Sequence, residues 1–98
     1  YIEAWTEARR TLAKSYDKLL TNTGAVIPVE VAECRHVYHV YSVRVPKRDA
    51  IRTQLEDLGV STNIHYPTPV HMQPGYADLG YSEGDFPVSE MTALLADT

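Results

Sequence analysis

The chain has 98 residues, of which 44% are hydrophobic, and its nine basic and 13 acidic residues give a net charge of −4. A chain of this length forms one small domain that buries roughly 65% of the surface of its unfolded form. The acidic balance and the lack of a basic cluster argue against nucleic acid as the main partner, and no apolar run reaches the length of a membrane span.

The first predicted element is an amphipathic helix over residues 2–20. Its apolar side chains recur at steps of three and four residues, which is typical of one helix face. The members of this face are Trp5, Ala8, Leu12, Tyr16 and Leu19. The charged side chains off this face are expected to be solvated, namely Arg9, Arg10, Asp17 and Lys18.

A β-strand is predicted over residues 36–45, because valine and tyrosine dominate the segment HVYHVYSVRV. Both alternating faces of this strand are fairly apolar. We therefore expect other elements to cover both faces over part of its length. Pro46 ends the strand.

A second helix is predicted over residues 47–58, with Gly59 at the C′ position after it. Its inner face is expected to carry Ile51, Leu55 and Leu58. A short second strand, residues 60–65, then leads into the next loop.

Residues 63–76, NIHYPTPVHMQPGY, are expected to form a rigid loop without helix or strand. Three prolines, Pro67, Pro69 and Pro74, each remove an amide donor and restrict φ. The loop also carries two histidines and two tyrosines: His65, Tyr66, His71 and Tyr76. Prolines in such a loop serve equally well to shorten a surface connection or to present these side chains to a ligand.

A last helix is predicted from Asp85 and Pro87 to about Leu95. The order helix, strand, helix, strand, loop, helix indicates a single α/β (α+β) domain over residues 1–98. The chain begins at Tyr1 without a methionine or a signal-peptide pattern and ends directly after this helix, so we expect a fragment of a longer protein.

No metal site or nucleophile–base pair is predicted. The chain has four histidines, but His36 and His39 point to opposite faces of a strand, and no second cysteine is present to complete a zinc site. Cys34, the only cysteine, excludes a disulfide framework and favours a reducing, cytoplasmic location. A lone cysteine is usually a small buried apolar group, although one beside Arg35 and His36 can be activated.

The succession HVYHVYSVRVPKRDAIRTQLEDLGVSTNIHYPTPVHMQPGY, followed by GDFPVSE, resembles the carboxy-terminal domain of the DegT/DnrJ/EryC1/StrS aminotransferases. The resemblance covers nearly the whole chain. Its parts are the strand around His39, Arg48-Asp49 at a helix start, Leu58-Gly59-Val60, His65-Tyr66-Pro67 with Pro69 and His71, and Phe86-Pro87-x-x-Glu90.

The resemblance implies the small domain of a fold-type-I aminotransferase, with helices packed on a short, mostly antiparallel sheet. The parent enzyme would use pyridoxal phosphate to transfer an amino group, from glutamate, to a keto sugar carried by a nucleoside diphosphate, as in deoxyamino sugar biosynthesis. His65 and Tyr66 are the expected contacts to this nucleotide sugar, because imidazole and phenol groups donate hydrogen bonds to phosphate and hydroxyls. His71 and His39 are further candidates that would serve equally well to hold the loop or the core.

No catalytic residue and no bound cofactor is expected in this chain itself. Pyridoxal phosphate requires a lysine that forms a Schiff base, and the lysines here, Lys14, Lys18 and Lys47, lie outside any context that resembles the family's lysine motif. The large domain that carries that motif is expected to precede this chain, and the family pattern continues beyond its last helix. The fragment is therefore expected to be inactive.

A homodimer or larger self-association is expected, since an isolated small domain exposes apolar surface. Two other interpretations stay open. The chain could be a stand-alone sugar-nucleotide-binding or regulatory module without catalysis, or a structural fragment with no activity of its own.

Overall fold

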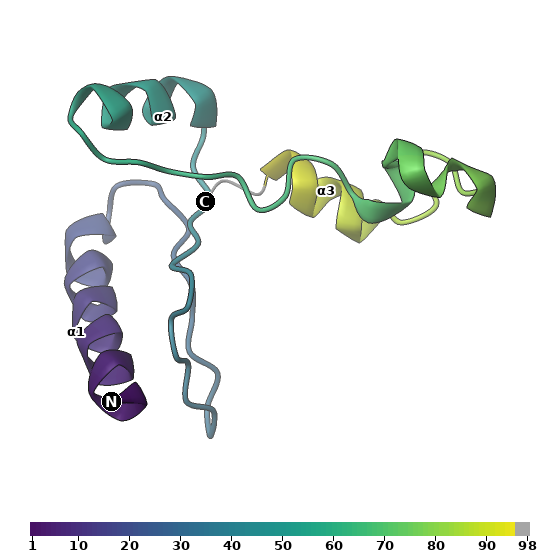
Figure 1. Ribbon diagram of the computed structural model, residues 1–98. Coiled ribbons are helices and arrows are strands. Elements are labelled where there is room, and N and C mark those ends of the chain that lie inside the picture. Colours follow the sequence, from purple (N-terminus) through teal and green to yellow (C-terminus); the bar gives the residue numbers. More distant parts are fainter. Residues whose placement is uncertain (96–98) are drawn as a thin grey trace. The chain divides into compact units, whose positions relative to one another are not determined.

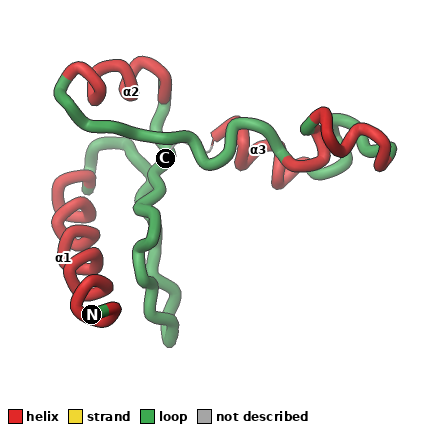
Figure 2. Tube along the Cα trace, viewed as in Figure 1, coloured by secondary structure: helices red, strands yellow, loops and turns green. Residues whose placement is uncertain are grey.

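The computed structural model describes residues 1–95, with the backbone alone for residues 94 and 95. The chain divides into two units, Tyr1–Pro46 and Lys47–Thr98, each of which is described by itself. The described part contains three α-helices and two short 3₁₀-helices (Figures 1 and 2). They are α1 (Ile2–Leu20), α2 (Arg48–Asp57), η1 (Val70–Met72), η2 (Pro74–Leu79) and α3 (Pro87–Leu95).

Helix α1 confirms the predicted helix over residues 2–20, but its apolar face is not the face that is buried. The side chains of the apolar stripe are exposed, with Trp5 at 62% and Leu19 at 75%. The buried positions are instead Thr6 and Ala13, which lie on a neighbouring face. Periodicity identifies an apolar face, but it does not say which segment of the chain covers that face.

The buried face of α1 contacts residues 25–45, which we call the arm; Figure 1 shows it running alongside the helix. Arg10 binds both carboxylate oxygens of Glu30 and donates to the carbonyl oxygen of His36 at 2.7 Å. Arg9 donates to the carbonyl of Val37 at 3.0 Å. The expectation that these arginines are merely solvated is therefore wrong.

Two further contacts join α1 to the arm. The hydroxyl of Tyr41 donates to Asp17 at 2.7 Å, so Asp17 is also not simply solvated, whereas Lys18 is exposed as expected. Partial burial and the bond to Asp17 raise the pKa of Tyr41. Arg35, on the arm, pairs with Glu3 and Glu7 at 2.8 and 2.6 Å. Charged and polar groups, together with the stacked rings of Tyr16 and Tyr41, join α1 to the arm.

The ion pair of Glu30 predicts acid lability of this unit. Hydrogen bonds from Arg10 and from the His36 amide lower the pKa of the Glu30 carboxyl from 4.5 to about 2. A carboxyl whose pKa is lowered on folding stabilises the folded state above its unfolded pKa, and this contribution is lost as the pH falls toward the folded value. Glu30→Gln should therefore be less stable than wild type at pH 7 and equal to it near pH 2.

Urea unfolding at pH 7, 4 and 2.5 measures this difference. Glu33→Gln, at an exposed carboxyl on the same arm, is the matched control and should show no such pH dependence. A stability difference between Glu30→Gln and wild type that stays constant from pH 7 to 2.5 would contradict the assignment.

The predicted strand at residues 36–45 is wrong. Within residues 1–95 the only β-pairing is an isolated antiparallel bridge between Val26 and Arg44, whose backbone bonds are 2.8 and 2.9 Å. Tyr38 has a φ of 47°, which is outside the extended region. A strand requires a neighbour for its backbone groups, and a two-stranded ribbon alone is marginal. The expected sheet, including the strand at residues 60–65, is therefore absent from the described chain.

Helix α2 confirms the second predicted helix, and its end follows the predicted glycine signal. Gly59 has a φ of +81° and donates to Glu56, while the next amide, that of Val60, donates to Leu55 at 2.8 Å. This pair of bonds is a Schellman motif, which satisfies carbonyls at the helix end. Of the predicted inner face, Ile51 and Leu55 are half-buried and Leu58 is exposed.

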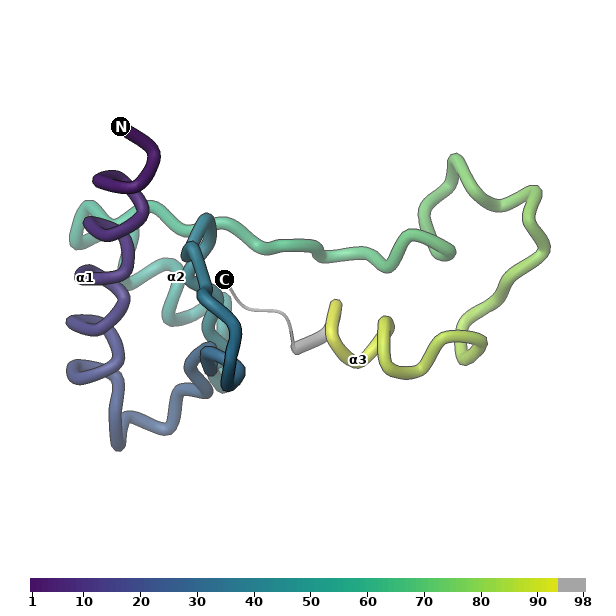
Figure 3. Tube along the Cα trace, turned by 90° about the horizontal axis from the view of Figure 1, so that it is seen from below, coloured from purple at the N-terminus to yellow at the C-terminus, as the bar shows by residue number. Residues whose placement is uncertain are grey.

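The proline loop contains more helix than expected, namely η1 and η2. Pro74 occupies the first position of η2, where its missing amide costs nothing, and Gly80 ends this helix at a φ of +75°. Figure 3 shows the chain running out through these two turns and returning through α3. Helix α3 confirms the last prediction, with Pro87 as its first residue.

The described chain has almost no apolar core. Ala13 and Ala93 are its buried hydrophobic residues, and none of its large side chains is fully buried. No helix within residues 1–95 combines the length and the apolar content needed to cross a membrane.

Candidate functional site

The proline loop and α3 enclose a hollow of about 270 Å³ in the second unit. One wall comes from the loop and the other from one face of α3. The lining side chains are His65, Tyr66, Thr68, Pro69, Val70, Gln73, Ser89, Thr92 and Ala93. Apolar surface makes up the larger part of this lining, which also carries hydroxyl, amide, imidazole and phenol groups. None of its members is acidic or basic apart from the histidine. Such groups exchange hydrogen bonds with sugar hydroxyls and phosphate oxygens.

His65 and Tyr66, the two residues directly before Pro67, both line this hollow. Their rings lie edge to face with centroids 5.2 Å apart. Both side chains are exposed, and Tyr66 reaches 71%. The loop therefore presents both expected contact residues to solvent at the same hollow.

His71 lies on η1 with its side chain only 8% exposed. Its Nε2 is 2.8 Å from Oε1 of Glu90 on α3, and its ring lies 4.8 Å from the ring of Phe86. This position holds the loop against α3. It does not bring the imidazole into the lining of the hollow.

His39 lies on the arm, in the first unit, and its side chain is exposed. The neighbouring His36 is engaged locally: its Nδ1 accepts the Tyr38 amide at 2.8 Å, and the two rings are 4.2 Å apart. Among residues 1–95, no three histidine, cysteine or acidic side chains come close enough to hold a metal ion. Cys34 is exposed, not buried as lone cysteines usually are.

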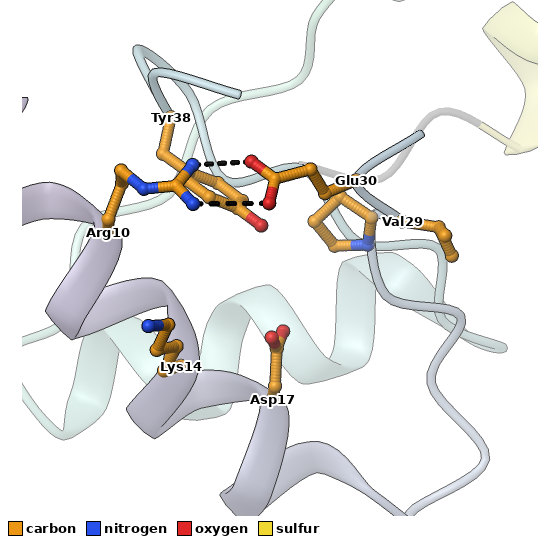
Figure 4. A pocket seen from close by; sticks show the side chains of 7 residues that line it. Arg10, Lys14, Asp17, Val29, Glu30 and Tyr38 are labelled. Atoms are coloured by element: carbon orange, nitrogen blue, oxygen red, sulfur yellow. Dashed lines mark hydrogen bonds and ion pairs between the residues drawn. The ribbon is translucent and has the colours of Figure 1, made fainter. Parts of the chain in front are cut away.

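A second hollow, of about 280 Å³, lies between α1 and the arm (Figure 4). It contains Lys14, Asp17 and Arg10, which are residue types that bind pyridoxal phosphate in general. Arg10 is occupied by its two bonds to Glu30, as the dashed lines in Figure 4 show, and Asp17 accepts from Tyr41. Lys14 is exposed, as are Lys18 and Lys47. The residues present therefore do not fit this cofactor.

A third hollow, of about 510 Å³, lies between α2 and residues 61–63 and has a mainly polar lining. Arg52 on α2 donates to the Thr62 hydroxyl at 3.3 Å and to the Thr62 carbonyl at 3.5 Å. These two bonds tie the segment before His65 to α2. We therefore assign Arg52 to holding the start of the proline loop in place.

Residues 1–94 match the sequence pattern of the DegT/DnrJ/EryC1/StrS aminotransferase family. The chain belongs to this family. The resemblance of the sequence to this family is thereby confirmed.

Curated relatives and solved structures agree with membership of the DegT/DnrJ/EryC1/StrS family. The chain is 42% identical, over 95% of its length, to the pleiotropic regulatory protein of Geobacillus stearothermophilus. It is 35% identical to the dTDP-3-amino-3,4,6-trideoxy-α-D-glucose transaminase of Streptomyces venezuelae, again over 95% of its length. The crystal structure of S. venezuelae DesV in complex with a ketimine intermediate superposes with a TM-score of 0.86 at 35% identity over 94% of this chain.

This chain spans about a quarter of the length of these relatives. It covers 26% of the Geobacillus protein, 25% of the Streptomyces transaminase and 25% of the DesV chain. A DegT/DnrJ/EryC1/StrS aminotransferase from Brucella abortus gives a TM-score of 0.77 with 23% of its chain covered.

Sequence reasoning did not assign a role to Glu90, Ser89 or Thr92. The last two reach the hollow because α3 folds back onto the proline loop, which spacing along the chain does not reveal. Glu90 was visible only as part of the Phe86-Pro87-x-x-Glu90 segment. A glutamate in the first turn after a proline is a helix-start signal, and this signal could have suggested a bond to preceding amides.

Proposed function

We propose that this chain forms the carboxy-terminal small domain of a pyridoxal-phosphate-dependent aminotransferase that transfers an amino group from glutamate to a keto sugar linked to a nucleoside diphosphate. The observation that carries this proposal is the similarity to the Streptomyces dTDP-sugar transaminase, at 35% identity and with a TM-score of 0.86 to the DesV structure. A relative from Aneurinibacillus thermoaerophilus, 32% identical, is also named as a dTDP-amino-sugar transaminase. A cytoplasmic location is part of the proposal, since a protein with one exposed, unpaired cysteine suits a reducing compartment.

In this proposal His65 and Tyr66 bind the nucleotide sugar. Both side chains are exposed at the hollow between the proline loop and α3, and both can donate hydrogen bonds. Pro67 and Pro69 restrict the backbone beside them, so less conformational freedom is lost on binding. His71 and His39 have weaker support as contacts, because His71 is committed to Glu90 and His39 lies in the other unit.

Pyridoxal phosphate would supply the electron sink for the transfer. Its lysine and its phosphate-binding groups are expected from the rest of the parent protein, because the lysines of this chain do not fit the cofactor. This chain contributes substrate contacts and the shape of the hollow.

Comparing the full-length protein with the 98-residue chain tests the proposal. With pyridoxal phosphate and sodium borohydride, the full-length protein should gain a reduced lysine adduct outside residues 1–98 of this numbering. With glutamate and a keto sugar linked to dTDP or UDP, it should release 2-oxoglutarate. The 98-residue chain should do neither. An adduct mapped by mass spectrometry to Lys14, Lys18 or Lys47 would contradict the proposal that the cofactor lysine lies outside this chain.

A second candidate is a sugar-nucleotide-binding regulator without catalysis. It is favoured by the names of two relatives: the pleiotropic regulatory protein, and the erythromycin biosynthesis sensory transduction protein EryC1 of Saccharopolyspora erythraea, which is 40% identical over 95% of this chain. A full-length protein that binds a dTDP- or UDP-sugar but releases no 2-oxoglutarate would establish this alternative.

A further inference from the structure

We propose that Glu90 is a positioning residue, which through His71 and the amides of Gly84 and Phe86 holds the proline loop against α3 and so sets the shape of the hollow that receives the nucleotide sugar. The proposal rests on the proposed function, which places the nucleotide sugar in this hollow. Glu90 does not itself line the hollow, and its effect passes through the residues it binds.

The Glu90 carboxylate gathers bonds from three places in the chain. Both of its oxygens lie 2.9 Å from the Gly84 amide, and Oε1 also accepts the Phe86 amide at 3.3 Å. Oε1 lies 2.8 Å from Nε2 of His71. One side chain thus joins η1, the turn before α3, and α3 itself.

These bonds assign the proton on His71. Partial removal from water alone would raise the pKa of Glu90, but the Gly84, His71 and Phe86 hydrogen bonds outweigh it and lower that pKa. The carboxylate is therefore ionised at neutral pH and can only accept hydrogen bonds. His71 therefore donates from Nε2–H to this carboxylate.

The connection to the hollow is direct along the backbone. His71 lies next to Val70 on η1, and Glu90 lies next to Ser89 on α3; Val70 and Ser89 line the hollow on its two sides. The Glu90 side chain is 14% exposed and that of His71 8%, so water competes little for their bond. Loss of the bond would release one wall of the hollow from the other.

Steady-state kinetics of the full-length protein test the proposal. The probe is dTDP-3-amino-3,4,6-trideoxy-α-D-glucose with 2-oxoglutarate, run alongside the corresponding UDP-linked amino sugar. Glu90→Ala should raise KM for the sugar roughly ten- to hundredfold, because small misplacements of binding groups have effects of this size. It should leave kcat within about threefold, since the reacting atoms are not touched.

Four further variants separate positioning from general damage. Glu83→Gln removes a charge from the same turn at an exposed side chain and should behave like wild type. His71→Gln keeps a donor near the position of Nε2 and should restore most of the binding that His71→Ala loses. Glu90→Gln keeps an oxygen that accepts hydrogen bonds from the amides, so it can replace Glu90→Ala if the alanine variant does not fold. Its KM should lie between the KM of the wild type and that of Glu90→Ala.

NMR spectroscopy detects the hydrogen bond between His71 and Glu90 without any measurement of activity. In ¹⁵N-histidine-labelled full-length protein, Nε2 of His71 should carry the proton at pH 7.5, and Glu90→Gln should change its ¹⁵N shift. A His71 with unprotonated Nε2, a folded Glu90→Ala with unchanged KM, or a variant that loses kcat alone would each overturn the positioning role. If the wild-type protein neither turns over nor binds dTDP- or UDP-linked sugars, the proposed function fails, and the positioning role fails with it. If the wild type is active and Glu90→Ala has the same KM, only the positioning role fails.

Discussion

Replacing His65 by alanine in the full-length protein is expected to weaken nucleotide-sugar binding by about ten- to hundredfold while the melting temperature barely moves. A hydrogen bond to a charged group contributes roughly 1.5–3 kcal/mol, and about 1.4 kcal/mol corresponds to a factor of ten in affinity. Tyr66→Phe removes only a hydroxyl and should have an effect of the same order. The fold should tolerate both changes because the two side chains are exposed.

Melting curves and titration with a dTDP- or UDP-sugar, measured on each variant, separate the two roles of the loop. Pro67→Ala is the informative partner variant, since it keeps both contact residues and loosens the backbone directly after them. It should weaken binding through lost preorganisation. Met72→Ala, at an exposed position on η1, serves as the control. A His65→Ala protein that melts several degrees lower but binds sugar as wild type does would assign His65 to folding.

The isolated 98-residue chain is expected to form dimers or larger assemblies. One face of α1 exposes Tyr1, Trp5, Leu12, Tyr16 and Leu19. Soluble proteins rarely expose so many large apolar side chains on one contiguous face, and such faces associate. In the parent protein other parts of the molecule would cover this surface, so the association is a property of the isolated chain.

Sedimentation velocity over a range of concentrations measures this expectation. Leu12→Glu places a charge in the middle of the exposed stripe and should shift the chain toward monomer. Thr11→Glu adds the same charge on α1 at an exposed position off the stripe, and should leave the assembly as it is. A monomer at high concentration, or equal effects of the two glutamates, would contradict the assignment.

The helices were predictable from the sequence because each carries its own local signals. The three- and four-residue spacing marked α1, and the observed helix Ile2–Leu20 coincides with the prediction. Gly59 favours the end of a helix and Pro87 favours the start of one, and neither preference needs a distant partner. The end of α2 and the start of α3 therefore also agreed with the prediction.

The strands were not predictable, because a strand is a property of two segments. Valine and tyrosine at residues 36–45 fit a pleated surface, but only Val26 offers a backbone partner within the described chain, at Arg44. The same reason explains the misjudged arginines of α1. Their partners, Glu30 and two arm carbonyls, lie 20 or more residues away and have no signature in the helix itself.

The candidate site was half predictable. The composition of the proline loop pointed to His65 and Tyr66, and both line the hollow. The loop could not reveal that α3 supplies the opposite wall, nor that His71 is committed to Glu90, because those contacts span 19 residues. Long-range bonds of this kind depend on the path of the backbone and not on local preference.

The two faces of α1 are offset by a single residue. Trp5 and Leu12 belong to the exposed stripe, and the residues directly after them, Thr6 and Ala13, are buried on the face that meets the arm. Each residue advances the helix by about 100°. Inserting one residue in α1 would therefore turn every later residue by about 100° and bring the apolar stripe beyond that point onto the arm. Deleting one residue would turn these residues by the same angle in the opposite direction and move the buried face away from the arm. We therefore expect a change of one residue in length to be more damaging within residues 2–20 than outside them.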